Sequence, residues 1–79
     1  MVNIGEGIKV AIGTITPSAH IIDFLSLLPG HFFIKKISRG KGGVIIVEVN
    51  SYQTISKQNA KTQILSAAKS CKISIEFRN

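Results

Sequence analysis

The chain has 79 residues, with 10 Lys and Arg against 4 Asp and Glu, so its formal net charge is +6. This length allows one small domain, residues 1–79, and the 44% hydrophobic content excludes a disordered chain. The single cysteine excludes an internal disulfide framework, and no apolar run is long enough to cross a membrane. The N-terminus lacks the basic region of a secretory signal, so we expect a cytoplasmic protein whose residues 1–6 form a flexible segment.

Apolar residues recur at a period of two in some segments and at helical spacing in others, so strands and helices alternate along the chain. A Thr-Pro pair at 16–17 is typical of a helix N-cap and first helical residue, and a Pro-Gly pair at 29–30 is typical of a helix stop. In chain order, the patterns predict a strand over 8–15, a helix over 16–28, a strand over 31–38, a turn over 39–43, a strand over 44–49, a helix from Thr54 or Ser56 to about Ser70, and a strand over 71–78.

The predicted order is β-α-β-β-α-β, the split βαβ or ferredoxin-like arrangement. We therefore expect an α+β fold, a ferredoxin-like sandwich in which two helices cover one face of a four-stranded antiparallel sheet. The usual strand order for this topology is 4-1-3-2, and the second face of the sheet stays open to water. The main alternative is a different order of the same elements, completed by a second subunit.

Alternation within each strand predicts which side chains face the helices. In the last strand the apolar set should face the core and the polar set the open face: Cys71, Ile73, Ile75 and Phe77 inward, and Lys72, Ser74, Glu76 and Arg78 outward. Lys9, Ala11 and Gly13 should also face outward, and Val44 and Ile46 should form a small exposed apolar patch suited to a protein partner. In the second strand, Phe32 and Ile34 compete with Phe33 and Ile37 for the core, and the pattern leaves this choice open.

The turn between the second and third strands is the most specific signal in the sequence. Residues 24–47 contain no acid and four bases, and three of the four residues 40–43 are glycine. A tight turn needs glycine where φ is positive, but three glycines exceed that need and would let backbone N–H groups approach phosphates. The sequence therefore predicts a phosphate-contacting hairpin made of Lys35, Lys36, Arg39, Gly40, Lys41, Gly42 and Gly43, with Lys9, Lys72 and Arg78 as a secondary patch.

A second acid-free stretch, residues 49–75, contains Lys57, Lys61, Lys69 and Lys72. Three of these lysines lie on the second predicted helix, where charges on the outer face commonly keep a small domain soluble. We interpret the lysines of this helix as a solvated face.

The predicted topology resembles that of the RNA-recognition motif over nearly the whole chain. Lys41-Gly42 stands where the third-strand motif of that family begins. Gly43, Ile45 and Glu48 occupy the positions at which the family stacks aromatic rings on bases, so we do not assign the chain to it. We expect any nucleic-acid binding to be largely electrostatic and weakly selective for sequence.

Patterns for catalysis and metal binding are weak. His20 and Asp23 are three residues apart on the first predicted helix, a spacing typical of an ordinary surface pair. Two histidines and one cysteine do not have the spacing of a structural zinc site, and Cys71 is expected in the core. We therefore expect no enzyme activity, no cofactor and no metal.

Two functions fit these patterns. The first is a small regulatory protein that binds nucleic acid, RNA or DNA, through the cationic hairpin. The second is an interaction module or phage-like inhibitor that docks on an acidic surface of a larger host protein, through its open sheet face or an edge strand. Homodimerisation through an edge strand is compatible with both, and neither involves a membrane.

Overall fold

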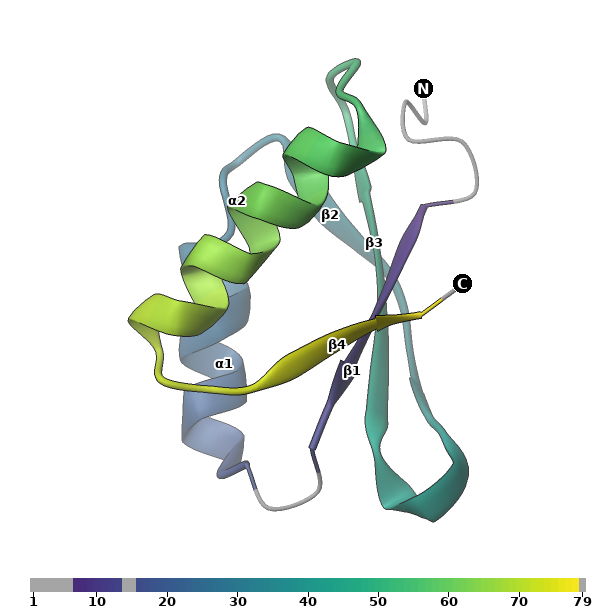
Figure 1. Ribbon diagram of the computed structural model, residues 1–79, viewed down its shortest axis with the longest axis vertical. Helices are drawn as coiled ribbons and strands as arrows, with labels where there is room; N and C mark the ends of the chain where they lie inside the picture. The colour runs from purple at the N-terminus through teal and green to yellow at the C-terminus, as the bar shows by residue number, and fades with distance from the viewer. Residues whose placement is uncertain (1–6, 14–15, 79) are drawn as a thin grey trace.

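The computed structural model describes residues 7–13 and 16–78 as two layers, with a four-stranded antiparallel sheet and both helices on one side of it (Figure 1). The expected α+β class is therefore confirmed, and neighbouring strands follow the order β2-β3-β1-β4. Residues 1–6, predicted to be a flexible segment, lie outside the described residues. The elements along the chain are β1 (Ile8–Ile12), α1 (Ser18–Leu27), β2 (Phe32–Arg39), the short 3-10 helix η1 (Lys41–Gly43), β3 (Ile45–Ser51), α2 (Lys57–Ser70) and β4 (Ile75–Arg78).

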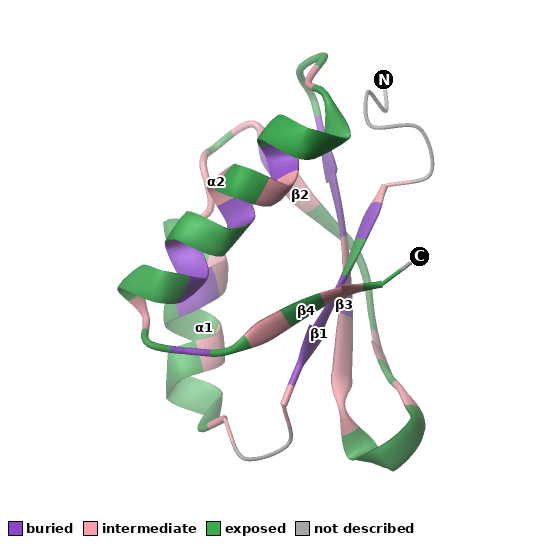
Figure 2. Cartoon of the chain, in the orientation of Figure 1, coloured by how far each residue is buried: buried purple, intermediate pink, exposed green. Residues whose placement is uncertain are grey.

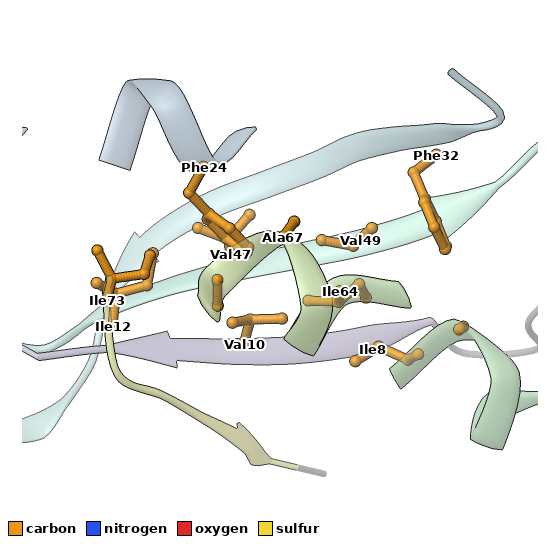
Figure 3. Close-up of a cluster of buried hydrophobic side chains, with 12 residues drawn as sticks. Ile8, Val10, Ile12, Phe24, Phe32, Val47, Val49, Ile64, Ala67 and Ile73 are labelled. Atoms are coloured by element: carbon orange, nitrogen blue, oxygen red, sulfur yellow. The ribbon is translucent and has the colours of Figure 1, made fainter. Parts of the chain in front are cut away.

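The core lies between the sheet and the helices. Phe24 of α1 is fully buried and points toward the sheet, close to Val47 of β3 in Figure 3. Figure 2 shows the inner side of α2 buried and its outer side exposed. All the residues of β1 and α2 that the periodicity assigns to the core are buried, namely Ile8, Val10, Ile12, Ala60, Ile64, Ala67 and Ala68.

The two helices begin differently. Ser56 caps α2 as predicted, because its hydroxyl oxygen accepts a hydrogen bond of 3.1 Å from the backbone N–H of Asn59. The prediction of Thr16 as the cap of α1 is wrong, since Pro17 occupies that position without a side-chain capping bond. The backbone N–H of Thr16 donates to the carbonyl of Gly13 at 3.1 Å, so Thr16 belongs to the turn that precedes the helix.

The last strand is shorter than predicted, because α2 ends in a turn that takes up residues 71–74. Lys72 has a φ of 57°, and its N–H donates to the carbonyl of Lys69. The N–H of Ile73 donates to the carbonyl of Ala68, which completes a Schellman motif with lysine at the position where glycine is usual. The placement of Cys71 and Lys72 in a strand is therefore wrong, and half-buried Cys71 is the C-cap residue of α2. Ile73 is buried as predicted, although it precedes β4.

A one-residue bulge in β2 resolves the choice that its sequence leaves open. Residues 32–34 pair with Ser51–Val49, whereas residues 36–39 pair with Glu48–Ile45, so Lys35 has no partner on β3. Directly paired residues share a face, so Phe32, Ile34 and Ile37 all lie on the helix side of the sheet. The alternation is irregular because two regular segments of opposite phase meet at Lys35.

The apolar side chains of the open face are less exposed than predicted. Ala11 lies on this face opposite Ile46 and Glu76, as predicted, but it is buried beneath its neighbours. Ile46 also lies on the open face as predicted, but both it and Val44 are half-buried rather than exposed. Ile46 packs near Gly40, where an added Cβ would lie 3.1 Å from its terminal methyl carbon. The two residues therefore do not form an exposed apolar patch.

Candidate nucleic-acid interface

Packing and backbone geometry account for all three glycines of the hairpin. Gly42 and Gly43 have positive φ values of 78° and 83°, which side chains rarely adopt. A Cβ on Gly40 would lie 2.8 Å from a methyl carbon of Val44. The turn is closed by a hydrogen bond of 2.8 Å from the N–H of Gly40 to the carbonyl of Val44. The prediction that three glycines exceed the needs of the turn is therefore wrong, although the turn is exposed and cationic.

The four bases of the hairpin do not gather on one face. Register places Lys36 on the open face opposite Glu48, and Arg39 on the helix side opposite Ile45. Lys35 occupies the bulge, and Lys41 lies in the 3-10 turn at the tip. A phosphate backbone that lies along one face of the sheet can therefore meet only part of this group.

A row of charged side chains crosses the open face at a single level. Lys9 pairs with Glu48 on β3 and with Arg78 on β4, and Glu48 pairs in turn with Lys36 on β2. Neighbouring strands are about 4.8 Å apart, so the row from Lys36 to Arg78 spans about 14 Å. It brings Lys9 and Arg78 of the predicted secondary patch together with one hairpin lysine. Lys72, the third member of that patch, follows α2 and lines a separate hollow with His20 and Ser74.

Four cations converge at one end of this row. A hollow of about 370 Å³, here called the cationic hollow, lies where β1 begins, β4 ends and α2 begins. Its lining residues are Gly7, Ile8, Lys9, Glu48, Lys57, Lys61 and Arg78. The Lys61 ammonium lies 5.6 Å from the centre of the Phe77 ring, a cation–π contact that directs this side chain toward β4. The hollow therefore has four positive charges against the single carboxylate of Glu48.

This cluster is not predicted from the sequence. The sequence pattern places Lys57 and Lys61 on a solvated helix face, and nothing in the linear sequence connects them to Lys9 or Arg78. The available signal was the α2 cap at Ser56, which fixes Lys57 as the first helical residue. Among residues 7–13 and 16–78, no lysine or arginine forms an ion pair with a carboxylate. The cations of the hollow are therefore available to an external anion.

Aromatic rings lie at the other side of the open face. Phe33 pairs with Asn50, which by alternation shares the face of Glu48. The ring of Phe33 stacks on that of Tyr52 with a centroid distance of 4.5 Å, and Tyr52 is 64% exposed. Phe32 is instead buried in the core. The open face therefore combines this aromatic pair with Lys9 and Arg78 at the margin of the sheet, where Lys57 and Lys61 reach the cationic hollow from the helix side. Cations and an exposed aromatic surface together suit a nucleic-acid strand.

His31 lies directly before β2, where its ring nitrogens contact two other elements. Its Nδ1 lies 2.8 Å from the hydroxyl oxygen of Ser51, and its Nε2 lies 3.0 Å from the side-chain oxygen of Gln63. The hydroxyl oxygen of Ser51 also accepts a hydrogen bond of 3.0 Å from the N–H of Gln53. This network connects the start of β2 to the end of β3 and to α2. Both ring nitrogens of His31 have hydrogen-bond partners within it.

Another hollow, about 450 Å³ in volume, lies at the other end of α2 and includes His20, Asp23, Cys71 and Lys72.

Across the described ranges, no three His, Cys, Asp or Glu side chains are close enough to hold a metal ion. No helix within them is long and apolar enough to cross a membrane. The chain matches no protein-family model, no curated protein and no solved structure.

Proposed function

We propose that this protein is a small regulator that binds single-stranded nucleic acid through its phosphates, without catalysis, in the cytoplasm. The observation that carries the proposal is the cationic hollow, which is lined by Lys9, Lys57, Lys61 and Arg78, none of which forms an ion pair with a carboxylate among the described residues. Phosphate contacts dominate the affinity of proteins for nucleic acid, and a cluster of lysines and arginines supplies them.

We also propose that the fold is ferredoxin-like. Read from β4, the strands follow the order β4-β1-β3-β2, and every neighbouring pair is antiparallel. Both helices lie on one side (Figure 1), which leaves the second sheet face available to a ligand. This order and these layers support the ferredoxin-like arrangement.

The charged row suggests a path for the strand. A single strand that leaves the cationic hollow passes Arg78 and Lys9, crosses the open face and reaches Lys36 on β2. The pair formed by Phe33 and Tyr52 then lies close to this path and offers a surface for an unpaired base. A duplex hides its base faces and cannot use these rings, so we assign single strands rather than duplex DNA.

Sequence selectivity should be weak. Contacts between cations and phosphates position a strand but do not identify its bases. Glu48 and Glu76 on the open face also reduce the net charge there, which limits the affinity. RNA and DNA of equal length are therefore expected to bind with similar affinity.

Fluorescence anisotropy with labelled single-stranded RNA, single-stranded DNA and duplex DNA over a salt series tests the proposal. On single strands the slope of log K against log salt is about −0.7 for each phosphate contact. The double variant Lys9→Gln/Arg78→Gln should make this slope less steep by about one unit or more, since two contacts are lost. The matched control Lys69→Gln/Lys72→Gln removes equal charge at the far end of α2 and should keep the slope. Absence of binding at low salt, or equal slopes in both variants, would refute the proposal.

The quadruple variant Lys35→Ala/Lys36→Ala/Arg39→Ala/Lys41→Ala measures the contribution of the hairpin. Only Lys36 belongs to the charged row, so this variant should lose less affinity for each charge removed than Lys9→Gln/Arg78→Gln. A larger loss of affinity for each charge removed would show that the main phosphate contact is made by the hairpin.

One observation favours a second candidate function, docking on an acidic protein. β2 is an eight-residue strand at the edge of the sheet, and Ile37 on it is 56% exposed. A partner strand could add to this edge while its acidic groups meet Lys35 and Arg39. In a pull-down, loss of every captured protein after nuclease treatment would count against this candidate. This candidate would be supported if, after nuclease treatment, the wild-type protein still captures a protein partner and Ile37→Lys does not.

A further inference from the structure

We infer that the cationic hollow binds a terminal phosphate, the phosphomonoester at the end of a nucleic-acid strand, in preference to an internal phosphodiester. This inference rests on the proposed function and adds to it a preference for strand ends. An internal phosphodiester carries one negative charge, whereas a phosphomonoester carries between about 1.5 and 2 at neutral pH. The hollow has a net charge of +3, from four cations and one carboxylate, so it favours the more highly charged group.

The cations of the hollow form two unfavourable pairs, although Lys9 also lies opposite the acid Glu48 on β3. Lys9 and Arg78 lie directly opposite each other on neighbouring strands, where like charges destabilise a sheet. Lys57 and Lys61 are four residues apart on α2, where like charges destabilise a helix. Lys57 is also the first residue of α2, at the end where the helix dipole favours negative charge, and the first turn contains no acid.

These unfavourable placements meet in a volume of about 370 Å³. A dianion in the hollow would turn each repulsion into an attraction, and it would also satisfy the dipole of α2. Local rules of stability are broken mainly where a protein binds or reacts, so their coincidence around one hollow points to an anionic ligand.

The position of the hollow favours the end of a strand over its interior. Within the described residues, Lys9 and Arg78 are the last pair between β1 and β4, so the hollow that they line lies at the margin of this part of the sheet. A strand that crosses the open face from β2 reaches this margin last. Gly7 has a φ of 90° and no room for a side chain, since an added Cβ would lie 3.0 Å from the carbonyl oxygen of Val49. The wall at this point therefore consists of backbone alone.

Competition with three versions of one oligonucleotide tests the inference. The strand carries a 5′-phosphate, a 3′-phosphate or hydroxyl groups at both ends. We expect at least one phosphorylated end to bind about tenfold more tightly than the hydroxyl version, the effect of one additional hydrogen bond to a charged group. Lys61→Gln should reduce this ratio toward one, and the matched control Lys69→Gln should preserve it.

The outcomes separate this inference from the proposed function. If all three versions bind equally and with steep salt dependence, the protein binds nucleic acid but the end preference is refuted. If none binds at low salt, the proposed function fails as well. A tenfold ratio that persists in Lys61→Gln places the terminal phosphate elsewhere and also refutes the inference.

Thermal unfolding with inorganic phosphate as the probe gives a second, independent test. In a low-salt buffer without phosphate, Lys57→Glu should raise the melting temperature, because it removes the repulsion between Lys57 and Lys61 and places an acid at the start of α2. Phosphate should then stabilise the wild-type protein but not this variant. Lys69→Glu, at the other end of the helix, should lower the melting temperature and keep the response to phosphate. Destabilisation by Lys57→Glu, or an equal phosphate response in both proteins, would overturn the inference.

Discussion

Deletion of Lys35 should leave the fold intact, because this residue is the unpaired member of the β2 bulge. Pairing between β2 and β3 changes its register by one residue between Ile34 and Lys36. Without Lys35, the two segments of β2 join in a single regular ladder, and every existing pair is kept. Lys35 is exposed, so its removal uncovers no apolar surface. We expect the free energy of unfolding to change by less than about 1 kcal/mol, as for most surface changes.

Deletion of Glu48 from β3 provides the contrasting variant. β3 pairs with strands on both sides, so a missing residue disturbs two registers at once. Val49 would move to the open face, and Asn50 would take its place in the core. Loss of a buried valine costs about 1.5–3 kcal/mol, and an unpaired buried amide costs about 1–3 kcal/mol more. A domain of this size has a total stability of only about 4–12 kcal/mol, so this variant should be largely unfolded.

Urea denaturation followed by circular dichroism measures both variants under the same conditions. The deletion of Lys35 should keep a cooperative transition with nearly the wild-type midpoint, and the deletion of Glu48 should lower the midpoint sharply or abolish the transition. If the deletion of Lys35 costs more than about 3 kcal/mol, the bulge is required for packing, and the assignment of Phe32, Ile34 and Ile37 to one face is wrong.

Substitutions at four positions test other parts of the structure by the same denaturation assay. Lys72→Gly should stabilise the protein by about 1 kcal/mol, because glycine adopts the left-handed conformation of this position without strain; a loss of stability would argue against the turn. Gly42→Ala should cost about 1 kcal/mol through its positive φ alone, and Gly42→Asn should cost less. Ser51→Ala should cost about 1–3 kcal/mol, since it removes the hydroxyl partner of His31, and an unchanged midpoint would show that the network is not formed. Ile46→Lys should cost about 1 kcal/mol and leave a folded protein, and loss of the folded signal would show that the residue faces the core.

Hydrophobic periodicity predicts the buried residues correctly where the local sequence pattern and the tertiary contacts favour the same structure. The cap at Ser56 and the stripe formed by Ala60, Ile64, Ala67 and Ala68 define α2 from the sequence, and all four apolar residues are buried. The alternation of Ile8, Val10 and Ile12 likewise defines β1. In both elements, one regular period extends over the whole element without a defect.

Errors arose where the backbone departs from regular geometry without a glycine or proline to mark the departure. Lys72 adopts a left-handed conformation, so the apparent alternation from Cys71 to Phe77 continues through a turn that it does not reveal. Lys35 forms a bulge between two regular segments, and it is the same residue type as its neighbour Lys36, so the sequence does not mark the bulge. Both backbone conformations are selected by tertiary contacts, and a lysine is equally compatible with the regular alternative.

The cationic hollow follows from the pairing register of β1 and β4, which brings Lys9 beside Arg78 although the two residues are far apart in the sequence. Val10 pairs with Phe77, and this core contact forces Lys9 to lie opposite Arg78. A slip of one residue would separate the two charges, but it would also turn Phe77 toward the open face, so the fold cannot relieve the repulsion by sliding. Glutamine at position 9 or 78 would relieve it with no loss of packing, because both side chains are exposed. The core therefore requires the register but not the charges, and the anion that we propose for the hollow would give these charges a role that folding does not.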